Sequence, residues 1–276
     1  MGIMPSRLRP LVPLLAAILA LPALTGCGTE SPSDRQTTPV ASEAMPPPGD
    51  TSTEAAPTTD SAPDLSGRTI AIDPGHNGGN ASHPSEIARQ VPDGRGGTKP
   101  CNTTGTATAS DFPETDFTWA VGKTLAASLR EAGAKVIMSR DDNDGVGPCV
   151  DERGTFADDA DLMVSIHANG SESTSVKGFH VIVADPGDTK KLEDESINLA
   201  EDMSAAMADS FTPNKAYGKD AISHRPDLAG LNNASVPAVI VECGEMRNPD
   251  EAKAMESKSG QKKYAEALMQ GIVDWY

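Results

Sequence analysis

Short runs of apolar residues recur along the chain, and each is bounded by glycine, proline or polar residues. Runs of this length that are rich in Val, Ile and Leu are typical of buried β-strands. They span 68–73, 134–140, 160–168, 178–184 and 237–243. We therefore expect a strand at each of these positions.

Longer patterns with helical spacing separate the runs. In 113–133 the apolar residues stand at positions 117, 121, 125 and 129, on one face of a helix, and Gly133 ends the segment. Helices are predicted at 113–133, 151–160, 189–211 and 248–276. Strands that alternate with helices predict an α/β fold, a single domain with a largely parallel, twisted sheet flanked by helices.

The first 26 residues differ from the rest of the chain. Arg7 and Arg9 precede an apolar run at 11–24, which is shorter than the roughly 20 residues that a membrane-spanning helix needs. The sequence LTGC at the end of this run resembles a bacterial lipobox, where cleavage exposes a cysteine for lipid attachment. We expect 1–26 to be a lipoprotein signal peptide and Cys27 to carry the lipid; the alternative is an uncleaved membrane anchor.

Residues 27–67 form a second compositional zone, which is rich in Ser, Thr, Pro and Ala and has almost no large apolar side chain. Such a segment cannot offset the entropy lost on ordering, so we expect a disordered linker. The rest of the chain, 68–276, is long enough for one domain with a full core. The expected organisation is a globular domain on a lipid-anchored tether, outside the cytoplasmic membrane.

The chain is acidic, with 23 Lys and Arg against 40 Asp and Glu and a net charge of −17. Removal of residues 1–26 takes away two arginines and no acidic residue, so the mature charge is −19. This charge argues against binding to nucleic acid or to anionic surfaces. We expect a monomer that reaches the membrane through its lipid only.

Three cysteines remain after Cys27. Cys101 and Cys149 both lie in loop-like stretches, and an exported protein can keep a disulfide, so we expect these two to be bridged. Closing that loop would contribute about 4 kcal/mol in the chain-entropy model. Cys243 is then a small buried side chain within a strand.

Titratable residues follow three of the predicted strands. His76 follows the first strand, His167 stands near the end of the third, and Glu242 stands near the end of the last. The carboxyl ends of parallel strands meet at one edge of a sheet, where functional groups collect. A single histidine in such a place is more often structural, and a phosphate-binding loop at residues 75–80 is an alternative for the first one. The coincidence of three favours a metal site.

A catalytic zinc ion needs about three protein ligands and a nearby carboxylate that takes a proton from water. Glu114, at the start of the helix after Pro113, is a candidate third ligand. An acidic residue at a helix N-terminus is also explained by the helix dipole. No HExxH or CxxC motif is present, so spacing alone does not identify zinc.

Several motifs, in order, resemble the zinc-dependent N-acetylmuramoyl-L-alanine amidases of the amidase-3 type, which remodel bacterial cell walls. They are IAIDPGHNGG, the glutamate at the helix start, Arg153 followed by ADLMVSIHAN, and SVPAVIVECGEMRNPDEA. The resemblance extends over nearly all of 68–276 and implies the amidase-3 fold. It implies one zinc ion held by His76, Glu114 and His167, with Glu242 as the catalytic acid and base.

The resemblance also implies the reaction, hydrolysis of the amide between muramic acid and L-alanine in peptidoglycan or a muropeptide. The alternatives are a zinc peptidase that cuts within the stem peptide, a non-catalytic wall-binding lipoprotein, and a nucleotide-binding domain. The last lacks a P-loop lysine and a dinucleotide fingerprint.

Some positions depart from the family pattern or lie outside it. Cys243 and Glu245 stand where many relatives have apolar or aromatic residues, and His180 stands where relatives often have a glutamate or another polar residue. We expect His180 to be a strand or surface histidine, with a place facing the scissile amide as the alternative. The long segment 82–112 is interpreted as a flap beside the cleft, pinned through Cys101. His83 and His224 are interpreted as surface or structural histidines, and Arg153 as a brace near the site.

Overall fold

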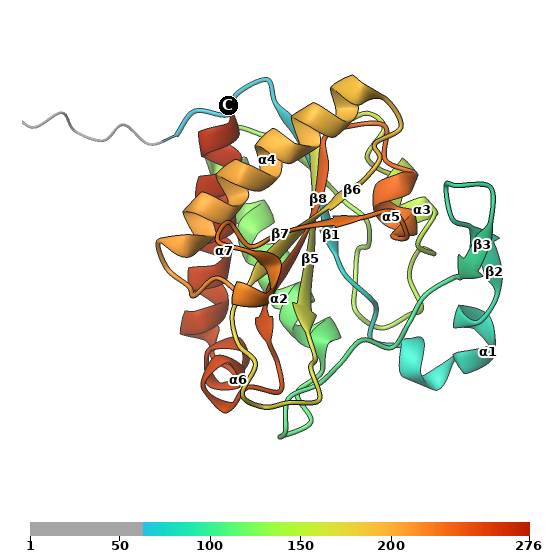
Figure 1. Ribbon diagram of the computed structural model, residues 1–276, viewed down its shortest axis with the longest axis vertical. Helices are drawn as coiled ribbons and strands as arrows, with labels where there is room; N and C mark the ends of the chain where they lie inside the picture. Colours follow the sequence, from blue (N-terminus) through green and yellow to red (C-terminus); the bar gives the residue numbers. More distant parts are fainter. Residues whose placement is uncertain (1–62) are drawn as a thin grey trace, which may run out of the picture. The chain divides into compact units, whose positions relative to one another are not determined.

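Within residues 63–276, which the computed structural model describes, six strands form one mixed sheet (Figure 1). Its order is β4-β1-β5-β8-β6-β7. Strands β4, β1, β5 and β8 are mutually parallel; β6 is antiparallel to β8, and β7 is parallel to β6. The bounds are β1 Thr69–Pro74, β4 Lys135–Met138, β5 Leu162–Asn169, β6 His180–Ala184, β7 Ile222–Arg225 and β8 Ala238–Glu245. The expected α/β fold with a largely parallel sheet is confirmed.

The segments expected to be a signal peptide and a lipid-bearing cysteine, 1–26 and Cys27, lie outside the described residues, as does nearly all of the expected linker. Among the described residues, no helix is both long and apolar enough to span a membrane.

Three long helices cover one face of the sheet, and short helices lie on the other (Figure 1). The long ones are α2 Glu114–Glu131, α4 Lys190–Ala208 and α7 Lys258–Trp275. The short ones are α3 Glu152–Thr155 and α5 Ala229–Asn232. Further single-turn elements are α1 Pro84–Ile87 and the 3₁₀ helices Asn80–Ser82 and Lys215–Tyr217.

The alternation of side chains along each strand divides the core in two. Ile70 and Ile72 of β1 belong to the large cluster under the long helices, whereas Ala71 belongs to the small cluster on the opposite face. Met163 of β5 and Ile240 of β8 also face this second side. Because side chains two positions apart share a face, the polar residues that continue these rows lie on the thinly covered side of the sheet.

The predicted C-terminal helix is in fact two helices, α6 Pro249–Glu256 and α7. Ser257 between them has extended backbone, and its side chain accepts a hydrogen bond from the backbone N–H of Gly260 (3.0 Å). A serine that caps a helix in this way contributes about 1 kcal/mol. The apolar pattern runs across this corner without a break, which is why it predicts one helix.

The predicted helix at 151–160 is also shorter than expected, since only α3 forms within it. Strand β7 was not predicted, and neither was the small antiparallel pair β2 Gln90–Pro92 and β3 Thr98–Pro100. These strands are short and carry few apolar residues, so they leave little signal in the pattern. Cys243 is a buried free cysteine in the large core, as expected.

Candidate metal centre

The loop after β1 carries His76 and is built on a glycine that has no room for a side chain. The backbone N–H of Gly75 donates to the carbonyl of Ile166 (2.9 Å), which holds the loop against β5. A Cβ atom on Gly75 would lie 2.3 Å from the ring of His167. His76 itself has a φ of 57°, in the left-handed region that few side chains adopt. The DPGH sequence therefore turns sharply where the two histidine rings meet.

A buried ion pair between Asp73 and Arg153 stabilises this loop. Asp73 is almost fully buried, pairs with Arg153 and accepts a hydrogen bond from the Ser165 hydroxyl (2.7 Å). Arg153 also donates to the backbone carbonyl of His76 (2.6 Å). Burial would raise the pKa of Asp73, but Arg153 and the serine hydroxyls outweigh it and hold that pKa below its usual value. Arg153 is thus a brace of the site, as its place in the sequence indicated.

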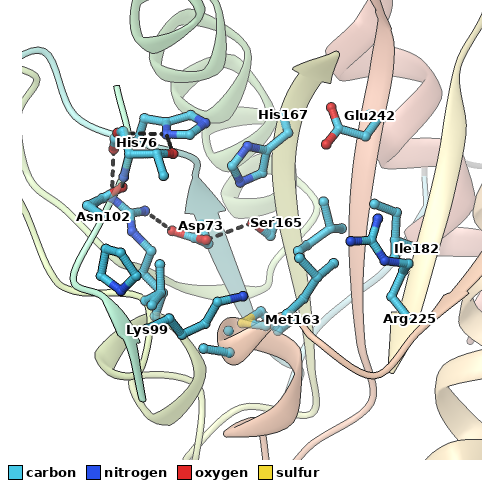
Figure 2. A pocket seen from close by; sticks show the side chains of 18 residues that line it. Asp73, His76, Lys99, Asn102, Met163, Ser165, His167, Ile182, Arg225 and Glu242 are labelled. Atoms are coloured by element: carbon cyan, nitrogen blue, oxygen red, sulfur yellow. Dashed lines mark hydrogen bonds and ion pairs between the residues drawn. The ribbon is translucent and has the colours of Figure 1, made fainter. Parts of the chain in front are cut away.

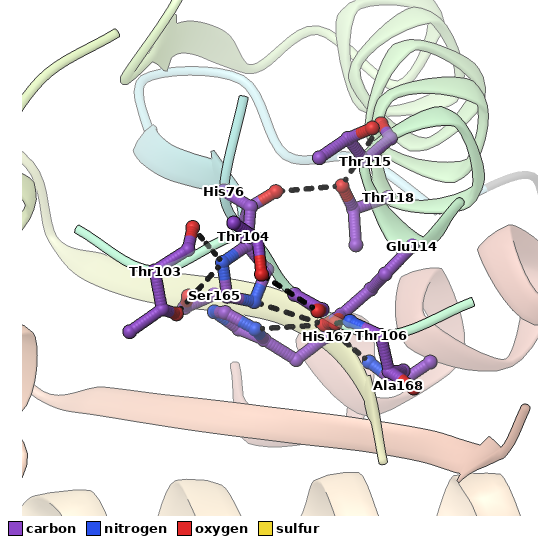
Figure 3. A network of polar contacts seen from close by, with 12 residues as sticks. His76, Thr103, Thr104, Thr106, Glu114, Thr115, Thr118, Ser165, His167 and Ala168 are labelled. Atoms are coloured by element: carbon purple, nitrogen blue, oxygen red, sulfur yellow. Dashed lines mark hydrogen bonds and ion pairs between the residues drawn. The ribbon is translucent and has the colours of Figure 1, made fainter. Parts of the chain in front are cut away.

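His76, Glu114 and His167 converge at the carboxyl ends of β1 and β5 (Figure 3). One carboxylate oxygen of Glu114, Oε1, lies 3.3 Å from Nε2 of His76 and 3.1 Å from Nδ1 of His167. The candidate ligand atoms of the three residues all lie within 4.8 Å of one another. Of the groups within residues 63–276, this is the one with three or more potential metal ligands so close together.

Backbone groups orient two residues of this cluster, Glu114 and His76. Glu114 is buried and accepts hydrogen bonds from the backbone N–H groups of Ala168 at Oε1 (3.0 Å) and Thr106 at Oε2 (2.9 Å). Nδ1 of His76 lies 3.1 Å from the carbonyl oxygen of Thr103. A proton on Nδ1 leaves the lone pair of Nε2 directed at the cluster, which is the tautomer that a metal ligand needs.

The donor set fits a zinc ion. Two imidazole nitrogens and one carboxylate oxygen are ligands that zinc prefers, and a catalytic zinc site keeps a further position open. Ligand bonds of about 2.0–2.1 Å in a tetrahedron place ligand atoms about 3.3–3.4 Å apart, close to the separations of 3.3 and 3.1 Å between Glu114 and the two histidines. Burial would raise the pKa of Glu114, but the two histidines hold it well below its usual value, so the carboxylate is charged.

Glu242 stands on β8 beside this cluster. It pairs in register with His167 of β5 on one side and with His180 of β6 on the other. Figure 2 shows its carboxylate turned toward His167. Its Oε2 atom is buried and has no hydrogen-bond partner. Burial raises the pKa of Glu242 well above its usual value, and the charges of Glu114 and Glu245 raise it further.

A cavity of about 310 Å³ opens next to these residues, on the thinly covered face of the sheet (Figure 2). Its floor is apolar and includes Met163, Ile182 and Ile240. Segment 82–112 forms one wall through Lys99 and Pro100. Cys101, in the same segment, forms the expected disulfide with Cys149. The flap thus lies beside the cavity.

The other histidines lie apart from the metal cluster. His180 is a strand histidine, as expected, since it is the first residue of β6. It is buried and stacks on Tyr217 with ring centroids 3.8 Å apart, and burial followed by the charge of Arg225 lowers its pKa to about 4. His83 and His224 are exposed, as expected. Lys99 and Arg225 line the cavity although nothing in the sequence singled them out. The only available signal was their positive charge in an acidic chain.

The fold and the site together define an α/β domain with a cluster of two histidines and one glutamate that could hold a metal ion, and an unpartnered carboxylate beside it. The comparison with known families names the class, because residues 70–274 match the family described as N-acetylmuramoyl-L-alanine amidase. The chain belongs to this family, as the resemblance of its motifs implied.

Individual relatives support the assignment. The N-acetylmuramoyl-L-alanine amidase Rv3717 of Mycobacterium tuberculosis is 42% identical over 211 residues, which cover 75% of this chain and 86% of the relative. The crystal structure of the N-acetylmuramyl-L-alanine amidase Ami1 from Mycobacterium smegmatis has a TM-score of 0.73 at 40% identity, covering 77% of this chain and 98% of that one. An N-acetylmuramoyl-L-alanine amidase from Clostridium difficile shares the fold, with a TM-score of 0.58 at 22% identity and coverage of 75% and 96%.

Proposed function

We propose that this chain is a zinc-dependent amidase that hydrolyses the bond between N-acetylmuramic acid and the L-alanine of the stem peptide. Family membership supports the class of reaction. The observation that carries the proposal is the juxtaposition of the His76, Glu114 and His167 cluster with the unpartnered carboxylate of Glu242.

His76, Glu114 and His167 would hold one zinc ion. When bound, zinc would supply a Lewis acid that polarises the scissile carbonyl and makes water nucleophilic near neutral pH. The hydrogen bonds to Glu114 from Ala168 and Thr106 fix the carboxylate before any metal arrives. This preorganisation reduces the cost of assembling the site.

Glu242 would move the proton. Its carboxylate takes a proton from the attacking water and later delivers it to the nitrogen of the leaving alanine. No group in the described part of the chain donates a hydrogen bond to Oε2, so this oxygen is available to the reactants. Burial raises its pKa, which strengthens the carboxylate as a base.

The domain would work outside the cytoplasmic membrane. A cell-wall substrate requires export, and the disulfide between Cys101 and Cys149 suits an oxidising compartment. Cleavage after residue 26 and lipid attachment at Cys27 would place the monomeric domain on a tether that faces the wall.

Metal removal and reconstitution test the proposal. The wild-type protein is stripped with a chelator, and hydrolysis of purified peptidoglycan is followed by labelling newly exposed amino groups. Activity should disappear and return with one equivalent of zinc per chain. A protein that binds the wall but releases no amino group in any metal state would be the non-catalytic alternative.

A further inference from the structure

Besides Arg153, which pairs with Asp73, two cationic side chains line the cavity beside the metal cluster, one on each of two walls. Lys99 belongs to β3 of the flap, and Arg225 is the last residue of β7. Figure 2 shows both side chains reaching toward the space over the apolar floor. Two cations in one cavity are notable because the chain as a whole carries a net charge of −17.

Asp227 ties the two cations together. Its carboxylate oxygens accept from Nε and Nη2 of Arg225, both at 2.8 Å, and its backbone carbonyl accepts from the ammonium group of Lys99. One carboxylate balances one of the two positive charges, so the pair keeps a net positive charge. Arginine has five N–H donors and lysine has three, so both keep donors free for a ligand.

The other charged groups of the cavity do not neutralise this pair by contact. Asp73 is paired with Arg153, and Glu242 makes no ion pair with either cation among the described residues. Met163, Ile182 and Ile240 give the same cavity an apolar floor. The cavity is therefore lined by the candidate reacting groups, by apolar side chains and by the pair of cations.

This arrangement matches a peptide rather than a sugar. If the scissile amide lies at the metal cluster, the small apolar side chain of alanine can lie on the floor and the next residue can reach the cations. N-acetylated sugars are neutral, whereas a peptide can carry a carboxylate at this position. Arginine and lysine on opposite sides can bind one carboxylate with charge-assisted hydrogen bonds.

We propose that Lys99 and Arg225 form a carboxylate subsite that selects substrates with an acidic group on the residue after the alanine. The inference rests on the proposed amidase function, because that function places the alanine at the metal cluster. The subsite is built from two separate segments, so its formation also depends on the flap lying where the disulfide holds it.

The test compares a muramoyl dipeptide whose second residue has a free carboxylate with its carboxamide counterpart. Wild-type kcat/KM should be about tenfold higher for the carboxylate, because a hydrogen bond to a charged group is stronger than one to a neutral group, although access of water weakens it. Lys99→Gln and Arg225→Gln should each remove most of this preference. Their activity on the carboxamide should fall by a clearly smaller factor than their activity on the carboxylate. Lys219→Gln is the matched control, since Lys219 is 90% exposed, precedes β7 and lies outside the cavity.

Calorimetric binding of the two dipeptides to Glu242→Gln, with and without the cation substitutions, separates the subsite from catalysis. Tighter binding of the carboxylate form, lost on Arg225→Gln, supports the subsite even if wild-type turnover fails and the amidase proposal falls. Equal binding and equal turnover of the two forms would overturn the subsite. So would a loss of activity on both forms by the same factor in the Gln variants.

Discussion

At the scale of single residues, the surroundings of Glu242 determine how readily its carboxylate accepts a proton. A glutamate on a surface is charged and hydrogen-bonded to water, whereas this one has a buried oxygen without a partner and lies in register with His167. Two other carboxylates, Glu114 and Glu245, add to the raised pKa that burial causes. Such a group accepts a proton more readily than an exposed glutamate does, which is the property a general base needs.

Replacing this carboxylate should stop turnover without removing the metal. Glu242→Gln keeps the size of the side chain but cannot accept the proton, so kcat should fall by about 10²–10⁴-fold. Zinc content measured by elemental analysis should stay at one ion per chain, as in the exposed control Glu201→Gln. Full activity in Glu242→Gln would exclude it as the acid and base.

Asp73 contributes to the stability of the fold, and the size of this contribution depends on pH. Its folded-state pKa is held below the unfolded value of about 3.9. Stability from the pair with Arg153 is therefore fully present above that value and is lost as the pH falls through the lower folded-state pKa. Asp73→Asn, which leaves Arg153 buried without its partner charge, should cost about 3 kcal/mol near pH 7.

Denaturant unfolding of wild type and Asp73→Asn between pH 7 and pH 3 measures this contribution. The difference in unfolding free energy should shrink below about pH 4. A difference that stays constant or grows in acid would mean that Asp73 is not held ionised by Arg153.

At the scale of elements, the meeting of β1 and β5 sets the metal site. The loop after β1 must pass so close to His167 that only glycine fits at position 75. A methyl group there would collide with the imidazole ring and not with a flexible chain end.

Gly75→Ala should therefore displace His167 and weaken zinc binding, by about 10–100-fold if the effect resembles the loss of a supporting contact. Gly145→Ala is a suitable control, since the nearest atom to a new Cβ there is 3.9 Å away. Zinc affinity is measured by competition with a chelating dye. An unchanged affinity in Gly75→Ala would show that the loop can move away at no cost.

Apolar runs were sufficient to predict β1, β5, β6 and β8, because each is largely buried. They also predicted the edge strand β4, which is only half-buried but carries three apolar residues in a row. They could not predict β7, where Ile222 is the one apolar residue of the strand. They also could not show that Ser257 turns the chain between α6 and α7, since the apolar face continues through the corner. In these cases tertiary packing, and not local pattern, decides the structure.

The same limit applies to the site. His76, His167 and Glu242 stood out because each follows or ends an apolar strand. Glu114 had the context of an ordinary helix N-terminus, and only the family resemblance pointed to a ligand. Arg225 had no signal beyond its positive charge, because its position on the cavity depends on how β7 pairs with β6.

At the scale of the whole molecule, the large core and the cavity lie on opposite faces of the sheet. The long helices α2, α4 and α7 bury most of the core on one face, while the other face is thinly covered and open to a ligand. The flap, the end of β7 and the short helix α5 complete this second side. The metal cluster and Glu242 lie at the strand ends of that same face, so under the proposed function one cavity would serve both binding and chemistry.

The central claim is that one zinc ion at His76, Glu114 and His167, together with Glu242, cleaves the muramoyl–alanine amide. The most direct test is mass spectrometry of a single defined muropeptide digested by the zinc-loaded protein. The predicted products are an intact stem peptide with a free alanine amino group and a sugar with a free lactyl carboxylate. A peptide cut after the alanine, or an alanine still joined to the sugar, would contradict the claim.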